Sequence, residues 1–427
     1  MTSQAETSQN TGRMRPGRYR WVVCGLLFAA TAVNYIDRQT LALLKEPLSK
    51  QFHWGEQDYA GLVFWFQAAY AAGYIVFGGL VDRLGARVGY TIAVMLWTVA
   101  HIGHGFVSTF AGFKVMRVGL GLGESGNFPS GVKAVTEWFP KRERALAIGV
   151  FNAGSNIGAI IAPLLVPVVT LAWGWQAAFV VTGLIGVVWL IAWLAVYRRP
   201  DKHPKVGEAE LALIRSDPAD TEARIPWLSL LWKRETWAYA LGKFLIDPIW
   251  WMYLFWLPDF LLKRHHLDLK SFGLPLVAIY LLSDVGSIFG GWMSSALLKR
   301  GRSLNVARKA TMLICALAVI PVGWAMYIDD LWTAVGVIGL AAAAHQAFSA
   351  NLYAYPSDVF ERRAVASVIG IGGTLGGIGG MFMATAVGWV LSTVGSYTPI
   401  FVVAASTYLV ALLVVHLLSP RYAPAKV

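Results

Sequence analysis

Apolar runs of about 20 residues recur along the whole chain, and a helix of that length spans the hydrocarbon core of a bilayer. Short polar stretches separate the runs. The pattern predicts twelve membrane-spanning helices in two sets of six. The first set is Trp21–Leu44, Tyr59–Val81, Val88–Phe106, Ala111–Thr136, Arg144–Val169 and Trp175–Tyr197. The second set is Trp237–Leu262, Phe272–Leu298, Val306–Tyr327, Leu331–Tyr355, Ala364–Ser392 and Thr398–Leu418.

A polar segment with several prolines, residues 198–235, separates the two sets and is predicted to be a linker. Six-helix bundles are expected at residues 21–197 and 236–418, with tails at residues 1–20 and 419–427. Two bundles related by an internal repeat are a frequent transporter design, and the substrate site of such a transporter lies at their interface. The expected fold class is therefore an all-α membrane protein.

Lys and Arg are distributed unevenly between the two sides of the membrane that this pattern defines. Loops and tails on the side of the N-terminus contain most of the 36 Lys and Arg residues. The opposite loops contain Lys45, Lys50, Lys263, Arg264 and Lys270. Because basic loops stay in the cytoplasm, both termini and the linker are expected there, in a bacterial inner membrane. The first 20 residues contain no small-residue cleavage site and are interpreted as a tail, not a signal peptide.

The composition excludes an ordinary soluble enzyme, since 56% of the residues are hydrophobic and only 14% are charged. The net charge of +12 does not indicate nucleic-acid binding, because the basic residues are spread between apolar runs. Cys24 and Cys315 both lie inside apolar runs, so neither a disulfide nor a metal site is expected. The pattern G-x-G-x-x-G at residues 121–126 follows no strand and is not interpreted as a nucleotide site. We expect no enzymatic activity and no cofactor other than a coupling proton.

The first predicted span contains two ionisable residues, Asp37 and Arg38, next to Asn34 and Tyr35. Charge is costly inside a bilayer, so both side chains are expected to face a wet cavity or a partner. The planar fork of an Arg in such a cavity can bind both oxygens of a carboxylate. Partial burial favours the neutral form of a carboxylic acid, which makes Asp37 a candidate proton carrier. The alternative is a structural ion pair that joins two helices.

One face of the fourth predicted span carries charge. It contains Lys114, Arg117, Gly121 and Glu124. We interpret Glu124 as a proton site and Arg117 as the cation that regulates it. A static polar seam is the alternative. Together with Asp37 and Arg38, these two side chains are expected to point into one water-accessible chamber midway through the bilayer.

The loop after the second span, residues 78–87, contains small residues and the charges Asp82, Arg83 and Arg87. Small residues allow helices to approach closely, and an acid with two bases at a helix end can form a charge latch between helices. We therefore interpret the three charged residues as gating residues. The alternative is a plain basic cytoplasmic loop.

Other candidate substrate contacts are polar or aromatic residues inside spans. They are Asn152, Ser155 and Asn156 in span five, Trp250 and Trp251 in span seven, His345, Gln346 and Asn351 in span ten, and Thr374 in the Gly-rich span eleven. Aromatic rings with polar tips suit a sugar, although such rings are also common interfacial anchors. Span seven also contains Lys243 and Asp247, four residues apart, before Pro248. His101 and His104 are expected near the outer surface, without a function.

The spacing G-x-x-x-D-R-x-G-x-R in residues 78–87 resembles the signature of the major facilitator superfamily, and the resemblance covers essentially the whole chain. Further strings resemble the anion:cation symporter family, and most of all its hexuronate transporter branch. They are Asn34–Gln39, Gly121–Pro129, Glu137–Pro140, Lys243–Pro248, His345–Ser349 and Ser357–Phe360. The resemblance implies import of a galacturonate- or glucuronate-like sugar acid with protons. It also implies that Arg38 and Tyr35 contact the substrate, that Tyr70 helps, and that Asp37 and Glu124 carry protons.

Several choices stay open from the sequence. Where several sugar-acid relatives have a Gln in span five, this chain has Ser155, which leaves that sugar contact undecided. The substrate is a small sugar-acid anion or another organic anion, such as an aldonate or an aromatic carboxylate. The remaining alternatives are an exporter of hydrophobic drugs and a membrane receptor that binds a ligand without transporting it. Arg38 and Arg117 argue against a drug exporter. We expect a monomer, with protons or Na⁺ as the coupling ion and lipid as its surroundings.

Overall fold

The computed structural model describes residues 17–216, 227–423 and 425. Within these ranges the chain is helical and contains no strand, which confirms the predicted all-α class. The remaining parts of the predicted tails and linker, residues 1–16, 217–226, 424 and 426–427, lie outside the described residues.

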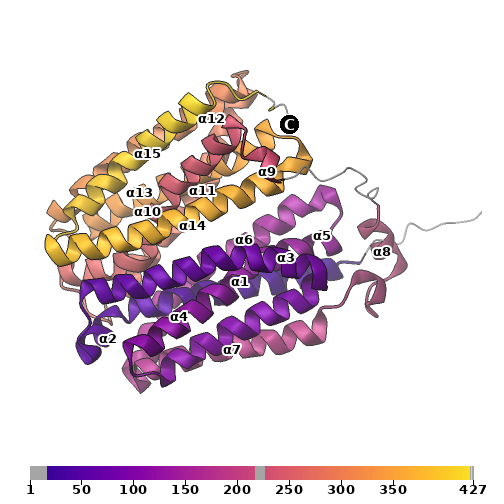
Figure 1. Cartoon of the computed structure of the whole chain (residues 1–427). Coiled ribbons are helices and arrows are strands. Elements are labelled where there is room, and N and C mark those ends of the chain that lie inside the picture. Colours follow the sequence, from indigo (N-terminus) through magenta and orange to yellow (C-terminus); the bar gives the residue numbers. More distant parts are fainter. Residues whose placement is uncertain (1–16, 217–226, 424, 426–427) are drawn as a thin grey trace, which may run out of the picture.

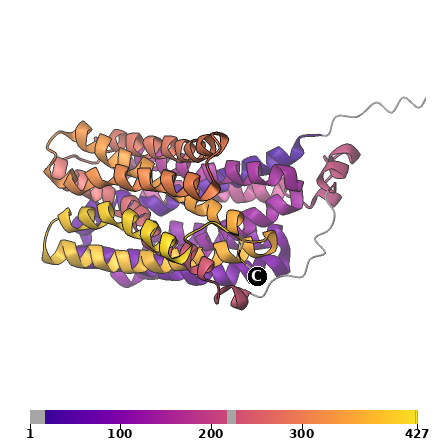
Figure 2. The same ribbon diagram turned by 90° about the horizontal axis from the view of Figure 1, so that it is seen from above.

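The helices form two groups that lie side by side (Figures 1 and 2). The N-terminal group consists of α1 (Tyr19–Leu43), α2 (Lys45–Phe52), α3 (Glu56–Gly103), η1 (His104–Phe106), α4 (Phe110–Ser125), α5 (Asn127–Trp138), α6 (Lys141–Trp173) and α7 (Trp175–Val196). The linker contains η2 (Pro200–Lys202), α8 (Glu208–Ile214) and α9 (Trp227–Leu230). The C-terminal group consists of α10 (Arg234–His265), α11 (Gly273–Lys299), α12 (Leu304–Val319), η3 (Ile320–Tyr327), α13 (Leu331–Val359), α14 (Arg362–Thr393) and α15 (Thr398–Leu418).

Among the described residues, nine helices are long and apolar enough to cross a membrane. Gly85 interrupts the longest of them, α3, with a φ of 78°, a backbone conformation that glycine adopts without a steric cost. Two predicted spans lie on either side of Gly85. The predicted fourth span is divided into α4 and α5, and α10 contains the charged residues Lys243 and Asp247. The total of twelve spans therefore stays a prediction.

Small residues bring helices of each group into close contact. Gly154 and Gly158 of α6 lie against α1, where a Cβ at Gly158 would collide with the carbonyl oxygen of Ala32. In the C-terminal group, Gly286 and Gly290 of α11 lie in the same way against the backbone of α13. Close backbone approach is the main way in which helices gain packing energy inside a membrane. These contacts fix how α1 and α13 are rotated, and therefore which side chains face the other group.

We expect Gly158→Ala to destabilise the protein by about 1–3 kcal/mol, because the added methyl group overfills the contact with α1. Gly149→Ala on the same helix is the matched control, since nothing lies within 4 Å of a Cβ there. This control should be neutral or stabilising by up to about 1 kcal/mol, because alanine favours a helix. Thermal unfolding in detergent measures both. Equal effects of the two substitutions would contradict the assigned packing.

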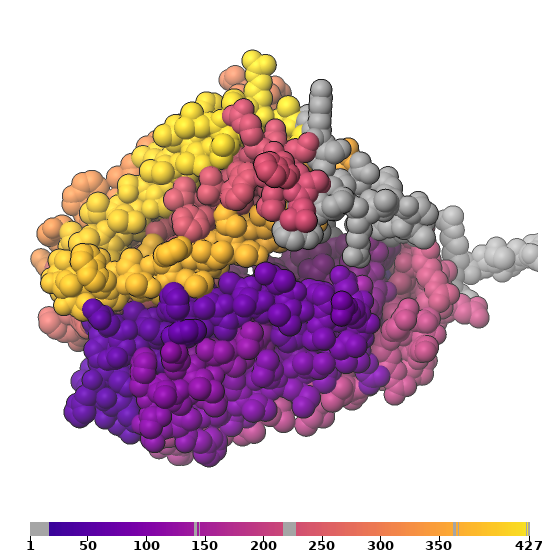
Figure 3. Space-filling model, viewed as in Figure 1, coloured from indigo at the N-terminus to yellow at the C-terminus, as the bar shows by residue number. Residues whose placement is uncertain are grey.

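The two groups meet closely at the end that carries α2. There the Tyr59 hydroxyl of α3 donates a hydrogen bond of 2.7 Å to the Phe255 carbonyl of α10. A Cβ at Gly388 of α14 would collide with the Cβ of Ala60. Toward the linker, the space-filling view shows the surface hollowed between the two groups (Figure 3). The structure is thus closed at the α2 end and more open at the linker end.

Candidate functional site

A buried ion pair joins α1 to α4. Arg38 Nε lies 2.7 Å from Glu124 Oε2, and the two side chains are 2% and 0% exposed. Arg38 Nη2 also donates a hydrogen bond of 3.1 Å to Asn34 Oδ1, one helical turn earlier. Removal of one partner from such a pair leaves an uncompensated buried charge, which costs about 3–5 kcal/mol. Arg38 and Glu124 therefore depend on each other for their charge states.

Aromatic rings surround the guanidinium of Arg38. Its carbon lies 4.7 Å from the ring centroid of Tyr35, 4.9 Å from that of Tyr70 and 5.0 Å from that of Trp251. The ring faces attract the cation and exclude lipid from it. Trp251 belongs to α10, so the C-terminal group contributes one wall of this cage. Three residues predicted to bind substrate thus meet at Arg38, on the interface between the two groups.

Arg117 of α4 lies beside this cage and is fully buried. Its guanidinium carbon is 4.3 Å from the ring centroid of Phe66 and 5.9 Å from that of Phe255. Its three guanidinium nitrogens have no hydrogen-bond partner among the described residues. Arg117 and Glu124 interact electrostatically along α4. Glu124 therefore lies between two cations, and only Arg38 holds it by a hydrogen bond.

Asp37 points away from Arg38, into the interior of the N-terminal group. Its Oδ1 lies 3.2 Å from His101 Nε2 of α3, and neither side chain is exposed. His101 Nε2 is also 2.7 Å from Thr182 Oγ1, whose hydroxyl donates to the Ala178 carbonyl. The His101 proton is therefore assigned to Nε2, which donates it to Thr182 Oγ1 and lies beside the Asp37 carboxylate. Arg38, Arg117 and Glu124 thus lie close together beside the cage, whereas the Asp37 side chain faces His101 in the interior of the N-terminal group. A water-accessible chamber shared by all four residues stays a prediction.

His101 and His104, for which no function is expected, are both completely buried. His104 stacks on Phe179 with ring centroids 4.9 Å apart. Both histidines follow a long apolar run near the end of a predicted span. The charge of Asp37 on another helix, which gives His101 its partner, is invisible in that local pattern.

Three predicted substrate contacts, Asn152, Ser155 and Asn156, belong to α6, which packs against α1 through Gly154 and Gly158. Ser155 Oγ donates to the Asn152 carbonyl at 2.7 Å and lies 3.3 Å from Asn156 Oδ1. Asn152 is exposed, whereas Asn156 is half-buried. A Cβ at Gly158, one turn beyond Ser155, would lie 2.8 Å from the Cβ of Tyr35. α6 therefore approaches Tyr35 of the cage at Gly158, and the role of its polar residues as substrate contacts stays a prediction.

In the C-terminal group, His345 of α13 stacks on Trp250, with ring centroids 5.3 Å apart and 9° between the planes. Its Nδ1 lies 2.6 Å from the Tyr408 hydroxyl of α15. His345 is buried, and Gln346 is half-buried. The Thr374 hydroxyl donates to the Gly370 carbonyl of its own helix. His345 and Trp250 thus form a stacked aromatic pair between α13 and α10.

Asn351, predicted as a substrate contact, takes part in helix packing in the structure. Its Nδ2 donates to the carbonyls of Gly290 and Ala347, at 3.1 and 2.9 Å, and its Oδ1 accepts from Arg308 Nη1 at 3.3 Å. The side chain is 1% exposed. Asn351 therefore joins α11, α12 and α13, because its amide is already engaged in helix packing.

The predicted gating loop is bound to its own group. Asp82 Oδ1 lies 3.3 Å from Lys133 Nζ of α5. Arg87 Nη2 donates to the Leu194 carbonyl of α7 at 2.8 Å, and Arg83 is exposed. The Ala86 amide donates to Glu137. These contacts hold α3, α5 and α7 together at the linker end.

A charge cluster that the sequence analysis missed joins the two groups at the α2 end. Lys45 Nζ lies 2.7 Å from Glu56 of its own group and 2.8 Å from Asp259 of α10. Lys263 is paired with Asp259 at 3.1 Å and also with Glu56, and the Tyr397 hydroxyl donates to Asp259. We call Lys45, Glu56, Asp259, Lys263 and Tyr397 the interbundle charge cluster. Its signal in the sequence is a set of charges at span ends, which the sequence alone cannot pair.

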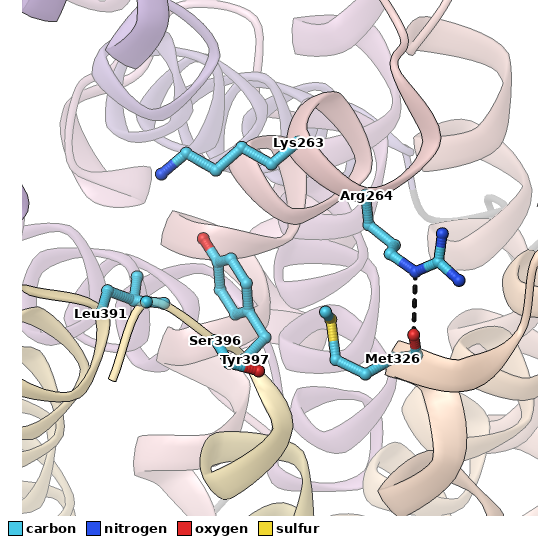
Figure 4. Close-up of a pocket in the computed structure, with 7 residues that line it drawn as sticks. Lys263, Arg264, Met326, Leu391, Ser396 and Tyr397 are labelled. Atoms are coloured by element: carbon cyan, nitrogen blue, oxygen red, sulfur yellow. Dashed lines mark hydrogen bonds between the residues drawn. The ribbon is translucent and has the colours of Figure 1, made fainter. Parts of the chain in front are cut away.

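A pocket of about 340 Å³ lies next to this cluster and is lined by Lys263, Arg264, Met326 and Tyr397, among other residues. Figure 4 shows Lys263 and Arg264 leaving α10 in different directions. Arg264 Nε donates to the Met326 carbonyl at 2.8 Å. All the residues that line this pocket belong to the C-terminal group, and Arg38 is not among them.

Two groups of membrane-spanning helices with a caged ion pair at their interface define a membrane transporter. The chain belongs to the Major Facilitator Superfamily, whose family model matches residues 27–308. It is 32% identical to the hexuronate transporter of Escherichia coli K12, over 93% of each chain. It is also 32% identical to the galacturonate transporter of Dickeya chrysanthemi, over 76% of this chain and 95% of that protein. These relatives confirm the predicted family and branch.

Further similarities agree with this assignment. The chain is 30% identical to the D-galactonate transporter of Escherichia coli O6:H1, over 89% of this chain and 91% of that protein. Among solved structures, it resembles a bacterial homologue of the human lysosomal transporter Spinster, in an inward-facing and occupied conformation. The TM-score is 0.70 at 18% identity, over 96% of this chain and 97% of that chain, which shows the shared fold. The protein is thus a multi-pass membrane protein, and its relatives point to a transporter and not to an enzyme.

Proposed function

We propose that this protein imports a sugar acid, such as galacturonate or glucuronate, across the bacterial inner membrane together with protons. The cage of Arg38 at the interface between the two groups carries the proposal, because it places a cation among aromatic rings. A guanidinium binds a carboxylate through two parallel hydrogen bonds, and aromatic faces suit the C–H faces of a sugar. The names of the relatives, which include hexuronate and galacturonate transporters, support this substrate class.

Protonation of Glu124 is the proposed coupling step. In the structure, Glu124 occupies Arg38 Nε, one of the donors that a substrate carboxylate needs. A protonated Glu124 loses its charge and releases Arg38, so that the carboxylate of the substrate takes its place. The buried Asp37 beside His101 is a second proton site. Proton and substrate thus bind cooperatively, because each lowers the cost of binding the other.

Alternating access follows from the orientation that the loop charges predict. With both termini in the cytoplasm, the α2 end faces the periplasm and the structure is open toward the cytoplasm. The interbundle charge cluster then closes the outer side. The substrate is released into the cytoplasm from this conformation. The return to a conformation that is open to the periplasm requires the interbundle charge cluster to separate.

Uptake of labelled galacturonate into proteoliposomes tests the function. We expect an imposed inward proton gradient to drive accumulation, and an imposed Na⁺ gradient at equal pH to have no effect. Unlabelled hexuronates and aldonates, added in turn, identify the preferred acid by competition. Absence of both uptake and binding for every sugar acid would contradict the proposal.

Asp259→Asn is expected to open the outer side, because it weakens the contacts of Lys45, Lys263 and Tyr397 at once. A cysteine introduced at Ala60, with Cys24 and Cys315 replaced by serine, reports this opening through its labelling by a membrane-impermeant maleimide. Ala60 is 4% exposed in the closed conformation. We expect labelling at least threefold faster, since breaking a buried pair costs about 3–5 kcal/mol.

Glu46→Gln in α2 is the matched control for Asp259→Asn. The Glu46 and Lys50 side chains are 39% and 75% exposed, and exposed pairs contribute little. In Glu46→Gln, the cysteine introduced at Ala60 should be labelled at the same rate as in the parent protein. An unchanged rate in Asp259→Asn would show that the cluster does not hold the outer side closed.

A further inference from the structure

One face of α10 points at the substrate cage. Lys243, Asp247, Trp251 and Phe255 are spaced four residues apart, so their side chains share this face. Trp251 contacts Arg38, and Phe255 packs on Phe66 of α3 with ring centroids 6.0 Å apart. The face therefore looks toward the N-terminal group. Asp247 lies one helical turn, about 5.4 Å, from Trp251 toward the linker end.

Lys243 and Asp247 form a second buried ion pair on this face, with Lys243 Nζ 2.7 Å from Asp247 Oδ1. Their side chains are 2% and 18% exposed, so Asp247 is the more accessible member of the pair. Lys243 Nζ lies 3.8 Å from the ring centroid of Tyr353 of α13, and Tyr353 is 47% exposed. A Cβ at Gly376 of α14 would collide with Asp247 Oδ2, so only glycine leaves room for this carboxylate.

Helix packing does not require this pair. A buried ion pair adds little stability compared with apolar residues of the same volume, and ionisable residues inside a membrane mark functional sites. Both members belong to one helix, so the pair does not join helices either. The coupling mechanism described above uses Arg38 and Glu124 and gives Lys243 and Asp247 no role.

We propose that Lys243 and Asp247 form the subsite for the hydroxylated end of the substrate, and that Asp247 selects sugar acids with one carboxylate over those with two. The inference rests on the proposed function and names its substrate class. With its carboxylate on Arg38, a six-carbon sugar acid extends over roughly one helical turn, which is the spacing from Trp251 to Asp247. The far end of the substrate then lies at the pair.

The chemistry of the pair fits hydroxyl groups. The Lys243 ammonium donates hydrogen bonds and the Asp247 carboxylate accepts them, so together they match the oxygen and the hydrogen of sugar hydroxyls. A second substrate carboxylate at this place would meet the negative charge of Asp247. Specific sites commonly reject a competitor through such like-charge contacts. Among the relatives, some are named for acids with one carboxylate and others for galactarate or D-glucarate, which have two.

Galactonate and galactarate test the inference, because they differ only in the last carbon, which is a hydroxymethyl group in one and a carboxylate in the other. Both compete with labelled galacturonate for uptake by the full-length protein in proteoliposomes. We expect galactonate to inhibit the parent protein at a concentration at least tenfold lower than galactarate. In Asp247→Asn this ratio should fall below threefold. An unchanged ratio, or a parent protein that accepts both acids equally, would overturn the inference.

Two further variants keep the test decisive. Asp247→Asn leaves Lys243 uncompensated, so the double variant Lys243→Met with Asp247→Asn removes both charges and should lose the discrimination as well. Asp284→Asn removes a half-buried carboxylate from α11 and should keep the tenfold ratio. An equal loss of discrimination in Asp284→Asn would overturn the assignment to Asp247. If the parent protein transports no sugar acid, the proposed function itself fails, which is a different outcome from transport without discrimination.

Discussion

Arg38→Lys is expected to lower sugar-acid uptake at least 100-fold, although it keeps the positive charge. A lysine ammonium is a point charge and cannot present the planar fork that binds both carboxylate oxygens. Its single nitrogen also cannot replace the two separate donors, Nε and Nη2, with which Arg38 holds Glu124 and Asn34 in the structure. Hydrogen bonds to charged groups contribute about 1.5–3 kcal/mol each, and loss of two of them accounts for the expected decrease.

Initial rates of labelled galacturonate uptake, together with binding by calorimetry, check this prediction. Arg264→Lys is the matched control, because Arg264 lies at the end of α10 and pairs with Asp329, which is 92% exposed. Its uptake should stay within twofold of the parent protein. Arg38→Lys with normal uptake would show that the carboxylate binds elsewhere.

Glu124→Gln is expected to abolish accumulation driven by a proton gradient and to retain substrate exchange. The neutral amide imitates a protonated Glu124, so Arg38 is permanently available for substrate, but residue 124 no longer binds and releases the proton that couples transport to the gradient. One pH unit corresponds to about 1.4 kcal/mol per proton, which equals about tenfold accumulation of substrate for each coupled proton. The parent protein should show such accumulation, and the internal and external concentrations should become equal in Glu124→Gln.

Counterflow separates coupling from binding, since vesicles preloaded with unlabelled galacturonate exchange it without a proton gradient. Glu124→Gln should exchange at a rate within a few-fold of the parent protein. Gradient-driven accumulation that survives in this variant would remove Glu124 from the proton pathway. It would leave Asp37, with its partner His101, as the remaining candidate.

The candidate site shows which of its features a local sequence pattern predicts and which it does not. Arg117 and Glu124 share a face of one helix, and their spacing in the sequence predicts this. The pairing of Arg38 with Glu124 joins residues of α1 and α4, and nothing in the sequence specifies it. Asp37 and Arg38 are neighbours in sequence, yet one faces His101 and the other the cage, because consecutive residues point about 100° apart around a helix.

The sequence by itself determined the helical class, most helix positions, the family and the charged residues inside the spans. These properties follow from apolar length, from the cost of charge in lipid and from specific local strings. Only the tertiary structure decided which charges meet, including Lys45 with Asp259 across the two groups. The physical reason is that helix rotation is set by contacts between distant small residues, such as Gly158 against Ala32. A one-dimensional pattern of hydropathy does not contain those contacts.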